Sequence, residues 1–175
     1  MSKNRRKMPL YRLALCAFLV ALSIVCGKFI KIPVGDVLRF SFENLPILFA
    51  GLVFGPMEGV LVGVVADLLG CVLYGYAVNP LVTLGAVCIG LLAGLGGRCL
   101  RRWPIPWRVA LTTAVAHLVG SVGIKTLGLA QYYAMPLLPL MGWRLLNYLV
   151  VGVVEAVLLC LLLRHSGIRR LTKGG

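Results

Sequence analysis

Long apolar runs, separated by short breaks rich in Gly, Pro and basic residues, organise the whole chain. A helix needs about 20 apolar residues to cross a bilayer, and most of these runs reach or approach that length. They predict helices at about residues 9–27, 43–54, 57–74, 81–97, 109–130 and 141–163. The pattern therefore indicates an all-α membrane protein, a six-transmembrane-helix bundle in which residues 1–175 form a single integral membrane domain.

The breaks between these runs differ in length. The connection over residues 28–42 contains Pro33, Gly35 and Asp36 and is long for a compact protein. Long connections of this kind are often functional. The helix that follows, at 43–54, is short for a full crossing, so we expect it to be tilted or buried beside a cavity.

The composition supports a membrane protein and excludes several other classes. Of the 175 residues, 60% are hydrophobic and 13% are charged, and the mean hydropathy is +0.96. Charged residues make up about 25% of a soluble domain, so a soluble enzyme, a nucleic-acid-binding domain and a disordered regulator are excluded. The six cysteines form no C-x-x-C pair or other metal-ligand spacing, so we expect no metal site. We also expect no cofactor.

The distribution of basic residues predicts the orientation of the bundle. The net charge is +13, and of the 18 Lys and Arg residues five lie in residues 1–12, four in 98–108 and four from Arg164 onward. With six helices these three segments lie on one side, and cytoplasmic segments of membrane proteins collect Lys and Arg. Both termini are therefore predicted to be cytoplasmic, and the positive charge requires no nucleic-acid partner.

Five basic residues fall outside those three segments, namely Lys28, Lys31, Arg39, Lys125 and Arg144. In a six-helix arrangement they lie in the first outer loop or toward the outer ends of the fifth and sixth helices. Each could extend its side chain to lipid headgroups. Together they could instead line a cationic outer cavity, which would attract an anionic solute.

Asp67, His117 and Glu155 lie inside predicted membrane helices, where a charge is costly and usually faces the interior of the bundle. They could form structural pairs, such as Asp67 with Lys125 or Arg144, or they could serve the function. For Glu155 the sequence suggests neither a partner nor a role. No G-x-S-x-G elbow, Walker A motif, H-E-x-x-H or Gly-rich dinucleotide motif is present, so we expect no catalytic residues. Any ATP hydrolysis would then belong to a partner.

Small residues recur at four-residue spacing, which lets membrane helices approach closely. Gly55, Gly59 and Gly63 form a double G-x-x-x-G motif, and Gly90 and Gly94 form another. We expect these glycines to pack helices within the bundle. Ala14, Ala17 and Ala21 form a stripe on the first helix, and this stripe is the one that we predict to meet a partner protein.

The residues around the second and third helices resemble a known family. The runs that carry the resemblance are Leu38–Ile47, Ala50–Pro56, Ala66–Gly70 and Asn79–Gly85, with Gly59, Gly63, Gly75 and Tyr76 between them. They are similar to the substrate-binding S component of an energy-coupling-factor (ECF) vitamin transporter, in particular to its folate branch. The chain size, the Ala-x-x-x-Ala of the first helix and the Arg144…Asn147 pattern extend the resemblance over nearly the whole chain.

The resemblance implies a mechanism for uptake. An S component binds its vitamin from outside and docks through its first helix on a transmembrane coupling protein that carries two cytoplasmic ATPases. It is thought to topple in the lipid bilayer and release the vitamin inward. For this chain the resemblance implies docking through Ala14, Ala17 and Ala21, and a multi-pass location in the cell membrane of a Gram-positive-type bacterium.

The chemistry of folate indicates which side chains could bind it. Its glutamate carries two carboxylates, which need cations, and its flat pterin needs aromatic faces and hydrogen-bonding groups. The residues that could supply them are Lys31, Arg39, Phe40, Asp67, Tyr74, Asn79, Lys125, Trp143, Arg144 and Asn147. Among these, Asp67, Asn79 and Asn147 are candidates for the pterin edge.

Other solutes and mechanisms fit the same sequence. Within the same family the vitamin could be pantothenate, riboflavin or a queuosine precursor. Neutral riboflavin would not need the outer cations, so substitutions that remove them would distinguish it from folate. An ion-coupled secondary transporter could use Asp67, His117 or Glu155. Such transporters often contain internal repeats, and the two halves of this chain show no convincing repeat.

Overall fold

The computed structural model describes residues 10–29, 31–34 and 38–165. The elements, in chain order, are α1 (Leu10–Phe29), β1 (Lys31–Val34), β2 (Leu38–Ser41), α2 (Leu45–Phe54), α3 (Pro56–Tyr74), α4 (Pro80–Cys99), α5 (Ile105–Ala116), the π-helical segment η1 (His117–Ile124), α6 (Lys125–Tyr133) and α7 (Leu137–Arg164). Since α5, η1 and α6 follow one another without a break, they form one rod of 29 residues. Within the described residues the helices thus make six rods, as the apolar pattern predicts.

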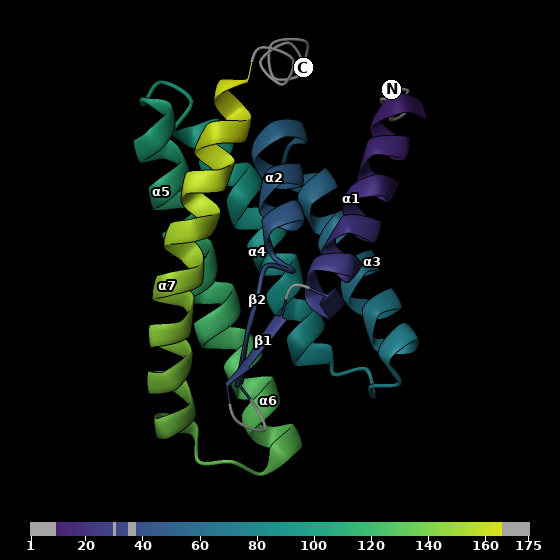
Figure 1. Ribbon diagram of the computed structural model, residues 1–175. Coiled ribbons are helices and arrows are strands. Elements are labelled where there is room, and N and C mark those ends of the chain that lie inside the picture. Colours follow the sequence, from purple (N-terminus) through teal and green to yellow (C-terminus); the bar gives the residue numbers. More distant parts are fainter. Residues whose placement is uncertain (1–9, 30, 35–37, 166–175) are drawn as a thin grey trace, which may run out of the picture.

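Five of these rods are long and apolar enough to cross a membrane, namely α1, α3, α4, the α5–η1–α6 rod and α7. Large apolar side chains cover their outer surface; Leu138, for example, is 83% exposed and Val72 is 72% exposed. Soluble proteins rarely expose such continuous apolar surface, whereas lipid tails match it. The start of α1 and the end of α7 lie at the same end of the bundle, as an even number of rods requires (Figure 1).

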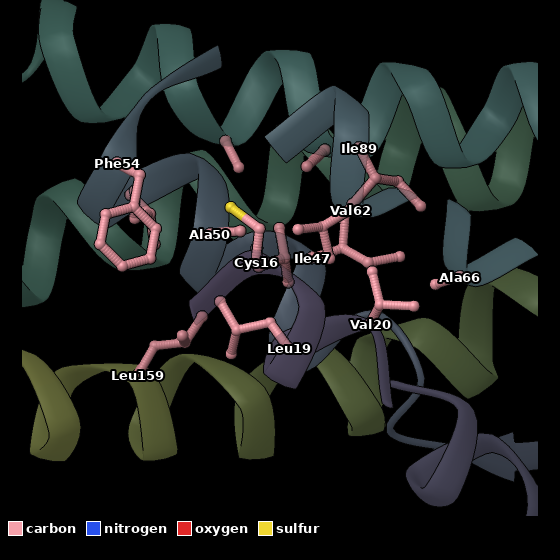
Figure 2. Packing of buried hydrophobic residues seen from close by; sticks show 14 of the residues in the cluster. Cys16, Leu19, Val20, Ile47, Ala50, Phe54, Val62, Ala66, Ile89 and Leu159 are labelled. Atoms are coloured by element: carbon pink, nitrogen blue, oxygen red, sulfur yellow. The ribbon is translucent and has the colours of Figure 1, made fainter. Parts of the chain in front are cut away.

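The sixth rod, α2, has ten residues and lies inside the bundle. It packs against α1, α3 and α4, and Figure 2 shows the apolar cluster that these helices build with it. A helix that is apolar on all sides is typically buried, and Ile47, Leu48 and Ala50 are at most 3% exposed. The short helix is therefore buried, which is one of the two arrangements that its length predicts.

The glycine spacing is explained by the close approach of α3 and α4. A Cβ atom on Gly63 of α3 would lie 2.7 Å from the backbone oxygen of Ala86 in α4. Cβ atoms on Gly59 and Gly90 would each overlap the backbone of the other residue. Glycine is required at these positions because the two backbones are in direct contact. Both G-x-x-x-G motifs contribute to packing within the bundle, as expected.

Prolines mark most of the helix starts. Pro56 and Pro80 are the first residues of α3 and α4, and Pro46 and Pro106 are the second residues of α2 and α5. Proline suits these positions because the first N–H groups of a helix have no partner inside the helix. Gly75 ends α3 in a left-handed conformation, with φ of 69°, which glycine adopts without strain.

Two helices begin several residues earlier in the structure than predicted, and one of the two also ends later. The fifth rod extends over Ile105–Tyr133 instead of 109–130, and α7 begins at Leu137 instead of 141. The prediction assigns Pro106 and Pro139 to loops because proline usually breaks a helix. Both residues lie in a first turn, where proline is tolerated, so the helices begin earlier than predicted.

A β-hairpin lies in the connection that the sequence analysis treats as irregular. β1 and β2 pair antiparallel, with Lys31 opposite Ser41 and Val34 opposite Leu38. β-branched, aromatic and other apolar residues favour such strands. The all-α prediction is therefore incomplete at this point, because a strand of four residues is too short to show a clear alternation of apolar and polar positions.

Candidate ligand-binding site

A cavity of about 370 Å³ lies at the end of the bundle opposite the start of α1 and the end of α7. Residues from all six rods, α2 included, contribute to its wall, and so do Ser41 of β2 and the connection that follows it. A cavity of this size is typical of small-molecule sites. The polar and aromatic residues of the wall are Ser23, Ser41, Glu43, Asp67, Tyr74, Tyr76, Asn79, Lys125, Tyr132, Tyr133, Arg144, Asn147 and Tyr148.

Six of the ten predicted binding residues line this cavity, namely Asp67, Tyr74, Asn79, Lys125, Arg144 and Asn147. Phe40 and Trp143 do not line it. Trp143 is 60% exposed, because it is about 100° around α7 from Arg144 and faces outward. The backbone of Lys31 and Arg39 lies in the hairpin, but their side chains lie outside the described part of the chain.

The guanidinium group of Arg144 is a cation in the wall, and its hydrogen bonds are to neutral groups. Its Nη2 donates to the backbone oxygen of Ser121 at 3.0 Å and to the hydroxyl of Tyr148 at 3.4 Å. The guanidinium carbon lies 5.3 Å from the centroid of the Tyr148 ring, within the range of a cation–π contact. Among the described residues Arg144 forms no salt bridge, and its Nε has no hydrogen-bond partner. Its charge is therefore available to an anion.

Lys125 differs from Arg144 because a carboxylate already pairs with it. The residue is 4% exposed, and its Nζ lies 3.3 Å from Glu43 Oε1 and 3.2 Å from Asn44 Oδ1. Ser23 Oγ donates to the backbone oxygen of Glu43 at 2.6 Å. These bonds connect α6 and α1 to the segment between β2 and α2. Glu43 therefore neutralises Lys125, which the sequence analysis treats as a cation for the ligand.

Asp67 of α3 accepts a hydrogen bond from Thr83 Oγ1 of α4 at 2.6 Å. Among the described residues it forms no ion pair with Lys125 or Arg144, so the structural pairing considered from the sequence is wrong. An ionised carboxylate has about four acceptor sites, and Thr83 occupies one of them. Asp67 can therefore accept further N–H donors from a ligand in the cavity.

The formal charges on the described wall cancel. Glu43 and Asp67 are acidic, and Lys125 and Arg144 are basic. Because Lys125 pairs with Glu43, the wall charges that have no opposite partner among the described residues are those of Asp67 and Arg144. A wall of this kind suits a ligand that combines an anionic group with a face rich in N–H donors.

Asn79 and Tyr74 connect helices along the wall. Asn79 Oδ1 accepts from the backbone nitrogen of Leu81 at 3.0 Å, which caps α4, and its Nδ2 donates to the backbone oxygen of Gly128 at 2.9 Å. The hydroxyl of Tyr74 donates to the backbone oxygen of Ile24. Both side chains therefore hold neighbouring elements together at the cavity.

Seven of the thirteen polar and aromatic wall residues were not among the predicted binding residues, and two of the seven, Glu43 and Tyr148, contact the cations of the wall. The prediction places Glu43 at the start of a helix, whereas in the structure it precedes α2 and reaches Lys125. Tyr148 follows Arg144 by four residues, a spacing that brings two side chains to one helix face. That spacing is a signal from which Tyr148 could have been predicted.

His117 and Glu155 lie behind the wall and do not line the cavity. His117 Nε2 and Glu155 Oε2 are within hydrogen-bond distance although 38 residues separate them, and His117 Nδ1 is 3.1 Å from Ser121 Oγ. The structure thus supplies the partner of Glu155 that the sequence does not suggest. His117 and Ser121 both belong to η1, and π-helical segments often occur at functional sites.

The alanine stripe lies on the outer face of α1. Ala14, Ala17 and Ala21 are exposed, whereas Cys16 and Leu19 face the apolar cluster (Figure 2). The stripe makes a shallow surface on which another helix could pack closely. The structure leaves this surface open to lipid or to another protein.

An apolar helical bundle with a charged and aromatic cavity at one end defines a membrane protein that binds a small polar solute. A family model described as "ECF transporter, substrate-specific component" matches residues 11–163. The chain therefore belongs to the substrate-specific (S) components of the ECF transporters. It is a transporter subunit and not an enzyme.

Two relatives match part of the chain in sequence. The chain is 30% identical over 82 residues to the folate transporter FolT of Clostridium novyi (strain NT), a match that covers 43% of this chain and 46% of the relative. An uncharacterized protein of Mycoplasma pneumoniae is 30% identical over 118 residues, which cover 66% of this chain and 41% of that protein. The chain thus matches just under half the length of these relatives.

The fold is that of solved S components. A crystal structure of FolT bound with folic acid has a TM-score of 0.71 and 23% identity, covering 86% of this chain and 90% of that one. The crystal structure of the S component for biotin from an ECF-type transporter has a TM-score of 0.65 and 20% identity, covering 100% and 96%. These likenesses establish the fold, and the solute has to be argued from the cavity.

Proposed function

We propose that this protein captures folate outside the cell and delivers it through an ATP-driven ECF importer. The observation that carries the proposal is the pair of charges without an opposite partner on the described wall. Arg144 can bind a carboxylate of the glutamate tail, because a guanidinium forms strong charge-assisted hydrogen bonds with carboxylates. Asp67 can accept hydrogen bonds from the amino group and ring N–H of the pterin.

The other wall residues support an aromatic ligand of this shape. Tyr74, Tyr76, Tyr132, Tyr133 and Tyr148 all line the cavity. Flat rings pack favourably on tyrosine faces, and the hydroxyl groups add polar contacts. The similarity to FolT of Clostridium novyi favours folate over the other vitamins of the family.

The cavity would face the outside of the cell. The arginines of the α4–α5 connection lie at the end of the bundle that holds the start of α1 and the end of α7, and basic ends are usually cytoplasmic. The cavity lies at the opposite end. We infer that the exposed stripe of Ala14, Ala17 and Ala21 docks on the coupling protein, and that two ATPase subunits of the ECF module supply the energy.

Titration calorimetry of the purified protein in detergent tests the choice of solute. Bound ligand is first removed by a denaturing wash and refolding, and folic acid, riboflavin, pantothenate and biotin are then titrated separately. We expect folic acid to bind with nanomolar affinity and the other three to give no heat of binding. Tight binding of another vitamin without folate binding would overturn folate and leave the S-component assignment intact.

A further inference from the structure

A buried polar cluster lies directly behind the wall of the cavity. Glu155 of α7 is 0% exposed and His117 is 3% exposed, and the two side chains are hydrogen-bonded through Oε2 and Nε2. An unpaired charge at this depth costs several kcal/mol. The hydrogen bond between the two side chains offsets part of that cost. Neither residue has a part in the function proposed above.

The ring of Tyr148 connects this pair to the cavity. The His117 and Tyr148 rings are stacked, with centroids 4.9 Å apart and an angle of 26° between their planes. The same Tyr148 ring contacts the Arg144 guanidinium, and its hydroxyl accepts from Arg144 Nη2. A continuous series of contacts thus runs from Glu155 through His117 and Tyr148 to the cation in the wall.

A second set of contacts passes through Ser121. Its hydroxyl lies 3.1 Å from His117 Nδ1, and its backbone oxygen accepts from Arg144 Nη2 at 3.0 Å. The backbone oxygen of Ser121 also accepts a hydrogen bond from Thr126 Oγ1 at 3.3 Å. The side chains of Arg144 and Thr126 thus bind the same backbone oxygen of the π-helical segment. Both acceptors of Arg144 Nη2 therefore belong to residues that contact His117.

We propose that His117 and Glu155 are positioning residues for the anionic end of the ligand. They hold Tyr148 and Ser121 in the arrangement that orients the Arg144 guanidinium toward a ligand carboxylate. This inference rests on the proposed function, because it takes the carboxylates of the folate tail as the anion. Its particular consequence is selectivity: loss of the pair should weaken binding of the charged tail and leave binding of the pterin unchanged.

Glu155→Gln tests this consequence, because glutamine keeps the shape of the side chain but cannot carry the carboxylate charge. Two ligands are compared by calorimetry: folic acid, and the folic acid bis-amide, in which both tail carboxylates are converted to neutral amides. We expect Glu155→Gln to bind folic acid about tenfold more weakly, the scale of one impaired charge-assisted contact, and to bind the bis-amide within about twofold of wild type.

Two further variants complete the calorimetric test. Glu58→Gln is the matched control, because Glu58 is also a buried carboxylate but lies away from the cavity. It should not change either affinity. The double variant Arg144→Gln/Glu155→Gln should bind folic acid no more weakly than Arg144→Gln alone, since the pair acts through Arg144. Equal loss for both ligands, or fully additive losses in the double variant, would overturn the proposal.

Histidine NMR provides a measurement that needs no ligand. The chain has two histidines, His117 and His165, and His165 is exposed at the end of α7. With labelled imidazole groups, Arg144→Gln should shift the His117 resonances and leave those of His165 unchanged. If the wild type binds no folate, the proposed function fails, and the NMR result alone then decides this inference. Unchanged His117 resonances would overturn it.

A second variant covers the case in which Glu155→Gln does not fold. Tyr148→Phe keeps the ring that stacks on His117 but removes the hydroxyl that accepts from Arg144. It should weaken folic acid binding by a few-fold without affecting the bis-amide. If Tyr148→Phe weakened binding of folic acid and of the bis-amide equally, the proposal would be overturned, as it would be by the same result for Glu155→Gln.

Discussion

Arg144 is the residue at which a single charge should affect binding most. We predict that Arg144→Ala weakens folate binding by more than tenfold, because the variant loses a charge-assisted contact with the tail. Arg102→Ala removes an exposed arginine from the α4–α5 connection and should leave the affinity unchanged. Calorimetric titration of both variants measures the difference. Wild-type affinity in a folded Arg144→Ala variant would exclude Arg144 from the site.

Asp67 should determine binding of the opposite end of the ligand. Asparagine replaces one acceptor oxygen with an amide donor, so we predict that Asp67→Asn loses at least about tenfold in affinity. The loss should be equal for folic acid and its bis-amide, because the tail is not involved. Thr83→Val, which removes the hydrogen bond to the carboxylate, should cost less. Equal binding by wild type and Asp67→Asn would mean that other groups contact the pterin.

At the scale of residues, the sequence predicts which side chains are unusual but not how they pair. Asp67 and Arg144 are recognisable because charges in apolar helices are rare. The pairing of Lys125 with Glu43 joins residues 82 positions apart, and His117 and Glu155 are 38 positions apart. Such partners depend on how the helices pack, which hydrophobic spacing does not determine.

At the scale of elements, the contact between α3 and α4 should tolerate no added side-chain atom. We predict that Gly90→Ala destabilises the protein by about 1–3 kcal/mol, because the new Cβ atom would overlap the backbone of α3. Gly142→Ala on α7 is the control, since a Cβ atom there has no heavy atom within 4 Å. Thermal unfolding in detergent, monitored by size-exclusion chromatography, compares the stability of the two variants. Equal stability of the two variants would contradict the close contact.

The helices were more predictable than the elements between and within them. Apolar runs predict all six rods of the described chain, and five of the six are long enough to cross a membrane. The hairpin strands have four residues each, and the π-helical segment interrupts a rod whose apolar pattern continues through it. Neither feature changes the hydrophobic pattern enough to be visible in the sequence.

At the scale of the whole molecule, binding and delivery should be separable. We predict that Ala17→Leu or Ala21→Leu keeps wild-type folate affinity but greatly reduces uptake by cells, since leucine would prevent close packing of a partner helix on α1. Ala114→Leu makes the same change on the exposed face of α5 and should preserve uptake. Normal uptake by both α1 variants would exclude the stripe as the docking surface.

The cancellation of charge on the described wall has an electrical consequence for the proposed transport. Folate brings two negative charges, and the four charged side chains of the described wall, which sum to zero, do not balance them. Inward movement of the loaded cavity would then be electrogenic. Against an interior that is negative by about 100 mV, each elementary charge costs about 2.3 kcal/mol. The membrane potential would oppose entry of the vitamin even without a concentration gradient. ATP hydrolysis by the partners would then have to supply energy against the membrane potential as well as against the concentration gradient.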